Sequence, residues 1–211
     1  MDIVMFIVSV ILAYLIGSFP TSYILTRTLR GADIRDLGSG NAGATNVLRN
    51  VGKLPAIITL VVDILKGFFV VTVFADFFYQ FECETLIRDF YVAFLGLVVI
   101  CGHIWSIFLK FRGGKGVATT IGVGAGMAPL VFLPSLIIWV VIFALTGYVS
   151  LASIISLIAF PIFAALFNAP FYTTIISAVI VMIVIVKHRS NITRLIKGEE
   201  SKTVVFKKKN K

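Results

Sequence analysis

Long apolar runs constrain this chain more than any other feature of its sequence. Residues 117–186 contain no charged side chain, and earlier runs cover Ile3–Leu25, Ala56–Phe78 and about Phe90–Leu109. With 59% hydrophobic residues and a mean hydropathy of +1.03, the chain is too apolar for an ordinary soluble domain. A membrane-spanning helix needs about 20 apolar residues. The sequence therefore predicts an all-α, polytopic membrane protein, since a β-barrel would alternate polar and apolar residues.

Basic residues set the expected orientation. Of the 19 Lys and Arg residues, 17 lie in segments 27–53, 110–115 and 187–211, and cytoplasmic loops are enriched in such residues. We therefore expect these segments inside, and the N-terminus and the acidic segment 76–89 outside. Proline, glycine and asparagine breaks divide the uncharged stretch into helices near 117–130, 132–147, 150–167 and 171–187. This gives about seven transmembrane helices with a cytoplasmic C-terminus; five crossings with long, bent helices is the alternative.

Three glycine- or asparagine-bearing polar stretches lie in these basic segments, and the first covers Leu37–Arg49. Its glycines allow backbone N–H groups to turn inward as an anion-binding nest, and a short helix from Ala44 would point its N-terminus at an anion. Arg49 can hold a phosphate through two parallel hydrogen bonds. A flexible loop is the competing interpretation. The candidate phosphate-binding residues are Gly38, Gly40, Asn41, Gly43, Thr45, Asn46 and Arg49, with Ser39 as a catalytic candidate.

The second stretch, Gly113-Gly114-Lys115-Gly116, resembles a Walker loop only superficially. Leu109 stands where that motif needs glycine, and Gly116 replaces its Ser or Thr, so no nucleotide is implied. A Gly-Gly turn, an ammonium group and a helix start nevertheless suit a phosphate. We take the three glycines as binding candidates and Lys115 as a catalytic candidate. His103, near the same membrane boundary, is a further candidate or a satisfied boundary histidine.

The third stretch follows the last apolar run. His188 and Asn191 are three residues apart, so a helix would place both on one face. A histidine at a membrane boundary is costly without a purpose, and we take both residues as catalytic candidates; an interfacial anchor is the alternative. Asp63 and Lys66 have the same spacing within an apolar run. We interpret them as a mutually neutralising pair with a structural rather than a catalytic role.

Missing motifs exclude several chemistries. The His–Asp dyad of soluble-type glycerolipid acyltransferases is absent, as are the paired aspartates of the CDP-alcohol phosphotransferases and a Gly-x-Ser-x-Gly elbow. Cys83 and Cys101 give no basis for a disulfide framework or a metal site. We therefore expect no metal.

The remaining motifs resemble those of one family, the bacterial acyl-phosphate:glycerol-3-phosphate acyltransferases of the membrane. Ser106 departs from the resemblance, because proline is expected there. The matching segments, in order along the chain, are Gly17–Pro20, Gly38–Arg49, Asp63–Gly67, Gly102–His103, Gly113–Thr119 and His188–Glu199.

The resemblance implies that an acyl group passes from acyl phosphate to the 1-hydroxyl of glycerol 3-phosphate, giving lysophosphatidic acid and phosphate. This is the first committed step of phospholipid synthesis. It implies no cofactor, no acyl-CoA or acyl-carrier-protein donor and no nucleic acid. The implied partners are the two substrates, membrane lipids and an upstream enzyme that forms acyl phosphate. The proton acceptor stays open between His188 and the leaving phosphate.

The expected organisation is one membrane-embedded catalytic domain, residues 1–187, with cytoplasmic motif loops at 27–53 and 103–117. A basic cytoplasmic tail, 188–211, contributes its first residues to the site, and the polar part from 197 onward is expected to lie on the anionic membrane surface. A transporter or channel for an organic phosphate is the rival function. Transporter sites lie near the bilayer midplane, whereas these polar clusters fall at expected cytoplasmic ends of helices in a bacterial inner membrane.

The shared cytoplasmic location is testable by labelling single cysteines placed at Ser39, Arg112 and Ser190. In intact cells, a membrane-impermeant maleimide should leave all three unlabelled, because each lies in a basic segment. The same reagent should label them after the inner membrane is permeabilised. Labelling of any one of them from outside would contradict a site built from all three stretches.

Overall fold

The computed structural model describes residues 3–81 and 87–203, and every regular element in this part of the chain is helical. Residues 82–86 of the acidic segment, which include Cys83, and residues 204–211 of the tail lie outside the described residues. The all-α membrane class predicted from the sequence is confirmed. The elements are α1 Ile3–Ser18, α2 Thr21–Arg30, η1 Ile34–Asp36, α3 Ala44–Asn50, α4 Lys53–Phe69, η2 Val70–Phe74, α5 Ala75–Tyr79, α6 Arg88–Ile104, η3 Ile107–Leu109, α7 Val117–Met127, α8 Pro129–Thr146, α9 Val149–Leu166, α10 Phe171–Lys187 and α11 Arg189–Ile196.

Within the described residues, five helical segments are long and apolar enough to span a membrane. They are Ile3–Arg30, Lys53–Tyr79, Arg88–Leu109, α8 and α9. A sixth is formed if α10 and α11, which are bent by 60° relative to each other, count as one span. The 11 residues of α7 extend only about 16 Å, which is short against a hydrocarbon core of about 30 Å. The expected count of seven therefore stays a prediction.

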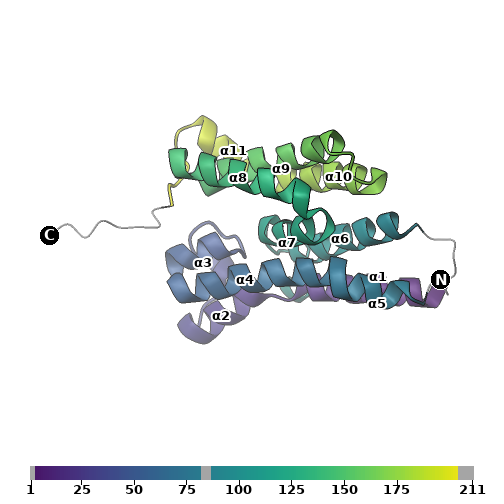
Figure 1. Cartoon of the computed structure of the whole chain (residues 1–211). Coiled ribbons are helices and arrows are strands. Elements are labelled where there is room, and N and C mark those ends of the chain that lie inside the picture. Colours follow the sequence, from purple (N-terminus) through teal and green to yellow (C-terminus); the bar gives the residue numbers. More distant parts are fainter. Residues whose placement is uncertain (1–2, 82–86, 204–211) are drawn as a thin grey trace.

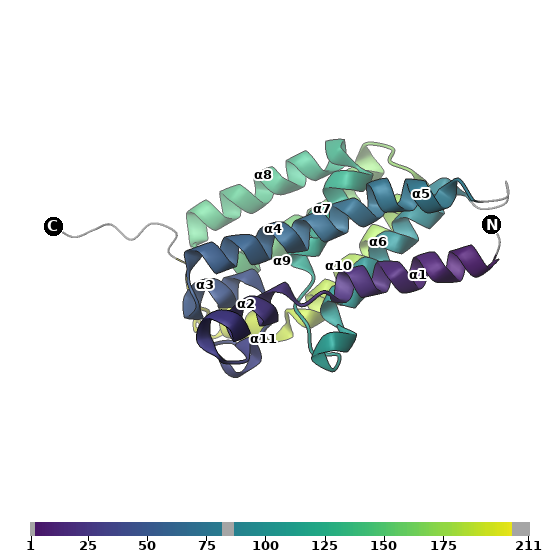
Figure 2. The ribbon, with the colours of Figure 1, turned by 90° about the horizontal axis from the view of Figure 1, so that it is seen from below.

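The uncharged stretch divides into four helices as expected, but its first break differs from the prediction. The helix break falls at Ala128, and Pro134 lies inside α8 instead of ending a helix. Proline is tolerated within helices of a membrane protein, where neighbouring groups can satisfy the freed carbonyl. The first span, expected over Ile3–Leu25, is part of the segment Ile3–Arg30 and contains a short break. Pro20 separates α1 from α2, and the ribbon changes direction there (Figure 2).

Ser106, where the resemblance led us to expect proline, ties the end of α6 to the end of α1. Its hydroxyl donates to the carbonyl of Ser18 at 2.6 Å, and the Ser18 hydroxyl donates to the carbonyl of Gly102 at 3.3 Å. Both serines are buried. These reciprocal bonds satisfy backbone groups that the two helix ends leave unpaired.

Glycines bring two helix pairs into backbone contact. A Cβ on Gly17 of α1 would lie 2.1 Å from the Val99 carbonyl oxygen of α6. A Cβ on Gly122 of α7 would lie 1.9 Å from the Ile64 carbonyl oxygen of α4. Small residues at helix contacts are typical of membrane proteins, where close packing replaces the hydrophobic effect. These contacts fix α6 and α7, which flank the second polar stretch.

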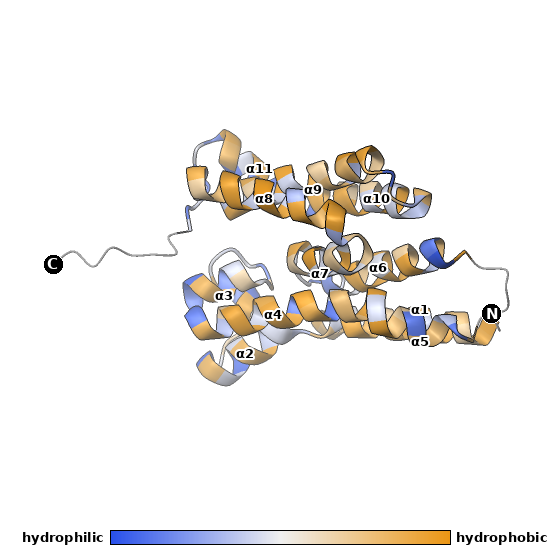
Figure 3. Ribbon diagram, in the orientation of Figure 1, coloured by the Kyte–Doolittle hydropathy of each residue, from blue (hydrophilic) through white to orange (hydrophobic). Residues whose placement is uncertain are grey.

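The bundle has two main groups of helices. In Figure 1, α8, α9, α10 and α11 lie to one side of the group formed by α1 to α6, and α7 lies between them. Helices α2, α3 and α11 gather at one end. Polar residues gather at that end as well, while the long helices are mostly hydrophobic (Figure 3). The three polar stretches are thus brought to one end of the molecule.

Candidate active site

Asn46 organises the first polar stretch. It is 2% exposed, and its Oδ1 accepts the backbone N–H of Ser39 at 3.0 Å. Its Nδ2 donates to the carbonyls of Leu37 at 2.9 Å and Asn41 at 3.0 Å. The sequence-based expectation made Asn46 a phosphate donor. The structure gives its side chain a different task, because both ends of the amide are already used to hold the loop.

The glycines of this loop supply backbone conformations that other residues avoid. Gly38 and Gly40 have φ of 53° and 69°, in the left-handed region that favours glycine. Gly43 precedes the expected short helix, which is α3. Asn41 and Thr45 are half-buried, and Ser39 is exposed. Among the described residues, no recorded interaction joins Ser39 to Lys115, so their shared pocket stays a prediction.

The second polar stretch packs directly on the end of α6. The N–H of Gly113 donates to the Ile104 carbonyl and the N–H of Gly114 donates to the His103 carbonyl, each at 3.1 Å. A Cβ on Gly114 would lie 2.1 Å from Nε2 of His103. We expected glycine here so that these N–H groups could approach a phosphate. The structure shows a different reason, since both N–H groups are bonded within the protein and His103 fills the space beside the turn.

Lys115 and Asn191 join the second and third stretches. The ammonium of Lys115 donates to Oδ1 of Asn191, and Nδ2 of Asn191 donates to Oε1 of Glu200 at 2.6 Å. His188, which is 3% exposed, lies between α10 and α11. Its Nδ1 is 2.8 Å from the Val184 carbonyl oxygen, which can only accept. We infer that Nδ1 carries the proton in the neutral ring, so Nε2 is left as the acceptor nitrogen.

Glu200 is the site residue that the sequence interpretation missed. Besides Asn191, its carboxylate accepts bonds from Ser150 at 2.8 Å and from Arg194 at 2.7 Å. Burial raises the pKa of Glu200, but the bonds from these three side chains outweigh it and leave the pKa below its ordinary value. The available signal was the pair Glu199-Glu200, the only acidic residues in the basic segment 187–211.

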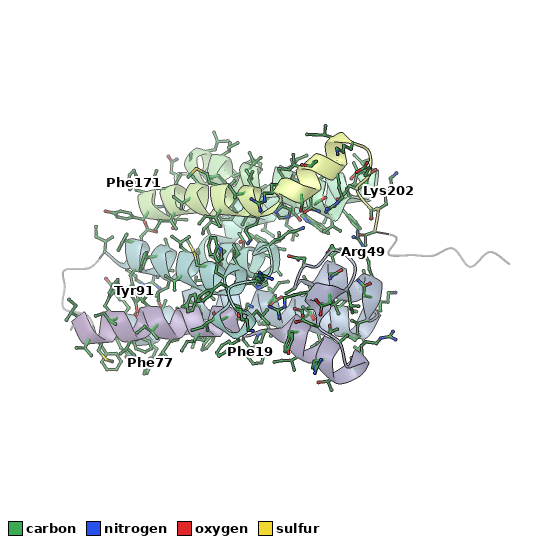
Figure 4. All side chains as sticks on the ribbon, turned by 180° about the vertical axis from the view of Figure 1, so that it is seen from behind. Phe19, Arg49, Phe77, Tyr91, Phe171 and Lys202 are labelled. Atoms are coloured by element: carbon green, nitrogen blue, oxygen red, sulfur yellow. The ribbon has the colours of Figure 1, made fainter. Side chains whose placement is uncertain are left out.

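The described part of the tail packs against the protein, although its polar composition suggested a segment that does not pack; the expected position on the membrane surface stays a prediction. The Thr203 N–H donates to the Gly147 carbonyl at 2.9 Å, and the Lys202 ammonium lies 5.5 Å from the ring centre of Tyr148. Nη2 of Arg49 donates to the Ser201 carbonyl at 2.9 Å and to Oγ1 of Thr203 at 3.1 Å. Hydrogen bonds from these polar groups make packing possible where composition suggested none. Figure 4 shows Arg49 and Lys202 at the same end of the bundle.

Asp63 and Lys66 form the expected ion pair, at 2.7 Å between Oδ1 and Nζ. The structure adds His103, whose Nδ1 lies 3.0 Å from Nζ of Lys66 and 3.5 Å from Oδ1 of Asp63. All three side chains are buried. His103 is therefore a satisfied histidine, and it is also the residue on which the Gly113–Gly114 turn packs.

The environment of Lys115 combines burial with several charges. The pKa of Lys115 is lowered to about 8: burial is the largest cause, Arg194 and Arg49 lower it as well, and the Glu200 carboxylate raises it. Lys115 lies in the loop before α7 and Arg49 on α3. Arg194 lies on α11 and Glu200 in the tail. The three polar stretches thus meet electrostatically around one ammonium group, and the arrangement can hold an anion at the end of the bundle.

Comparisons with known proteins show the family of the chain. The family model described as glycerol-3-phosphate acyltransferase matches residues 7–198. The chain belongs to the glycerol-3-phosphate acyltransferase family. It is 44% identical over 192 residues to the glycerol-3-phosphate acyltransferase of Prochlorococcus marinus strain MIT 9215, covering 90% of this chain and 93% of the relative. It is 45% identical over 190 residues to that of Geobacter sulfurreducens, with 90% and 93% covered.

A solved structure of the same family has the same fold. The crystal structure of PlsY (YgiH), an integral membrane glycerol 3-phosphate acyltransferase, in its glycerol 3-phosphate form matches with a TM-score of 0.85 at 37% identity, covering 94% of this chain and 96% of that one. Its lysophosphatidic acid form matches with a TM-score of 0.82 at 35% identity, covering 94% and 95%. The family and the integral-membrane architecture predicted from the sequence are therefore confirmed. The roles expected for individual site residues stay predictions.

The pKa of Lys115 predicts an alkaline limit to activity. Above about pH 8 the substrate-free enzyme loses the charge that attracts phosphate, so kcat/KM should fall by roughly tenfold per pH unit. Lys115→Arg should remove this decline up to about pH 9.5, because the pKa of arginine is above 12. Lys110→Arg, an exposed change in the same loop, is the matched control and should keep the wild-type profile. An identical decline in Lys115→Arg would assign the limit to another group.

Proposed function

We propose that this membrane acyltransferase moves a fatty acyl group from acyl phosphate to the 1-hydroxyl of glycerol 3-phosphate. The products are lysophosphatidic acid and inorganic phosphate. Family membership supports the acyltransfer to glycerol 3-phosphate, and the related PlsY was crystallised in glycerol 3-phosphate and lysophosphatidic acid forms. The observation that carries the proposal is the meeting of three polar stretches around Lys115, beside an apolar cavity.

Two cationic centres match the two phosphates of the proposed substrates. Lys115 contacts Asn191, and Arg49 lies on α3. The surroundings of Lys115 and Arg194 already hold the carboxylate of Glu200, which supports their ability to hold an anion. We assign the phosphate of glycerol 3-phosphate to Arg49 and the acyl phosphate to Lys115.

The apolar cavity supports a path for the acyl chain. It is lined by residues of α7, α8 and α9, among them Val117, which follows Lys115 by two residues in the sequence, and its volume of about 30 Å³ holds only part of a fatty chain. Its walls include Ile121, Trp139, Leu157 and Phe160. Burial of a CH₂ group contributes about 0.8 kcal/mol, so each CH₂ group of the acyl chain that enters the cavity would add to binding. The carbonyl end would then lie beside the cationic centre.

The proposed step needs no covalent intermediate on the enzyme. The hydroxyl oxygen of glycerol 3-phosphate forms a bond to the acyl carbon, and the bond between that carbon and the phosphate oxygen breaks. The leaving phosphate takes the electron pair, and Lys115 offsets its growing charge. Proximity of the two reactants can contribute roughly 7–11 kcal/mol, and one well-placed donor to the carbonyl oxygen about 3–4 kcal/mol.

The hydroxyl proton goes either to Nε2 of His188 or to the leaving phosphate. The contact of Nδ1 of His188 with the Val184 carbonyl leaves Nε2 free to accept a proton, whereas burial of the ring disfavours the imidazolium that would form. His188→Gln separates the two routes, because loss of a general base costs about 10²–10⁴ in rate. A loss below about tenfold would make the phosphate the acceptor.

The donor is tested with purified enzyme in detergent. Acyl phosphate and glycerol 3-phosphate should give lysophosphatidic acid and phosphate in equal amounts, without added metal or cofactor. Acyl-CoA and acyl-carrier protein serve as matched donors and should give no product. Turnover in detergent would also exclude the transporter alternative, since no compartment is present. Product from acyl-CoA but not from acyl phosphate would refute the proposed donor.

The assignment of Arg49 predicts a substrate-specific defect. Lysine acts as a point charge, whereas a guanidinium can make two parallel bonds to one phosphate. Arg49→Lys should therefore raise the KM for glycerol 3-phosphate by about tenfold, equal to about 1.4 kcal/mol, and change the KM for acyl phosphate less. Arg30→Lys, another exposed arginine at this end, is the control. Equal changes in the two KM values would remove the assignment.

A further inference from the structure

The buried group of Asp63, Lys66 and His103 contains one side chain more than a neutral ion pair requires. The three side chains belong to residues that are 3%, 7% and 8% exposed, on α4 and α6. Ionisable residues within membrane-spanning helices are costly and are usually kept for a functional reason. An isolated pair would be satisfied by Asp63 and Lys66 alone. The presence of the imidazole therefore calls for a further explanation.

Lys66 determines which nitrogen of His103 carries the proton. An ammonium group has three donors and no acceptor. Because Nζ of Lys66 lies 3.0 Å from Nδ1 of His103, Nδ1 accepts in the neutral ring and Nε2 carries the proton. Asp63 holds the ammonium in place at 2.7 Å. The pair thus fixes both the orientation and the tautomer of the imidazole.

The other edge of the imidazole lies against the turn that carries Lys115. A Cβ on Gly114 would come within 2.1 Å of Nε2. The His103 carbonyl also accepts the N–H of Gly114 at 3.1 Å. Asp63, His103 and Gly114 line one small cavity together with residues of the α1–α2 break, where Lys66 reaches the Phe19 carbonyl at 3.4 Å.

We propose that Asp63, Lys66 and His103 are positioning residues for catalysis. Asp63 and Lys66 hold the imidazole of His103 against the Gly113–Gly114 turn, and this contact sets the position of Lys115. The proposal rests on the proposed role of Lys115. The alternative is a group that only stabilises the helix bundle. The two explanations predict different kcat values for a variant that lacks the charges but still folds.

The first experiment is the double variant Asp63→Leu with Lys66→Met. It leaves no unpaired charge, and replacing a buried ion pair with apolar residues is often tolerated or stabilising. A displaced Lys115 predicts a fall in kcat of about 10²-fold, with the melting temperature in detergent near that of the wild type. The alkaline limit of the pH profile should move upward as Lys115 becomes less buried. A kcat within about threefold of wild type, or a lower kcat with an unmoved alkaline limit, would overturn the proposal.

The second experiment stays informative even if the double variant fails to fold. In the wild type, Gly114→Ala places a methyl group 2.1 Å from Nε2, whereas in His103→Ala the nearest remaining neighbour is the Ala42 carbonyl oxygen at 3.1 Å. We therefore expect Gly114→Ala to lower kcat strongly in the first background and by less than about threefold in the second, because residues in contact are coupled. Gly113→Ala is the matched control, since its Cβ would lie 2.1 Å from the His103 carbonyl oxygen, which both backgrounds retain. Equal effects of Gly114→Ala on kcat in both backgrounds would refute the proposal that His103 positions the turn.

The outcomes separate this inference from the proposed function. Wild-type enzyme is assayed first with acyl phosphate, acyl-CoA and acyl-carrier protein as donors. Failure with acyl phosphate refutes the donor, and the variants are then compared with whichever donor is used. Activity of His103→Ala within about threefold of wild type, with any donor, refutes the positioning role alone.

Discussion

Close backbone contact between helices is the constraint on which the rest of this structure depends. Lipid is as apolar as the side chains, so helices in a membrane gain little by hiding hydrophobic surface from it. Here Gly17 and Gly102 let α1 approach α6, and Gly67 and Gly122 let α4 approach α7. Of these helices, α4 follows the first polar stretch, and α6 and α7 flank the second. The glycines in these contacts therefore set the spacing of the helices to which the polar stretches are attached.

The site is assembled by groups that satisfy one another rather than by loops that are open to solvent. Asn46 closes the first stretch, the carbonyls of α6 close the second, and Glu200 links Asn191 to Ser150 and Arg194. Unmade hydrogen bonds of buried groups are costly, which explains why so few of these donors are free. Lys115 and Arg49 are the two cations for which the proposal requires a change of partner when substrate binds.

Residue spacing could predict some contacts of the site but not others. The pairing of Asp63 with Lys66 follows from helical spacing, and it is present. The placement of His103 against both of them does not, because it depends on the rotation of α6 relative to α4. The fold of the tail onto Arg49 and Gly147 was missed for a similar reason. Composition reports the average polarity of a segment, whereas two or three specific hydrogen bonds decide whether it docks.

The sequence by itself determined that this chain is a helical membrane protein, that its uncharged stretch divides into four helices, and to which family it belongs. Each of these depends on local pattern: apolar run length, breakers and ordered motifs. Only the tertiary structure decided that Asn46 supports its loop, that Gly114 accommodates His103 and that Glu200 joins the site. These are distances between residues far apart in the chain, and close packing of helices sets them.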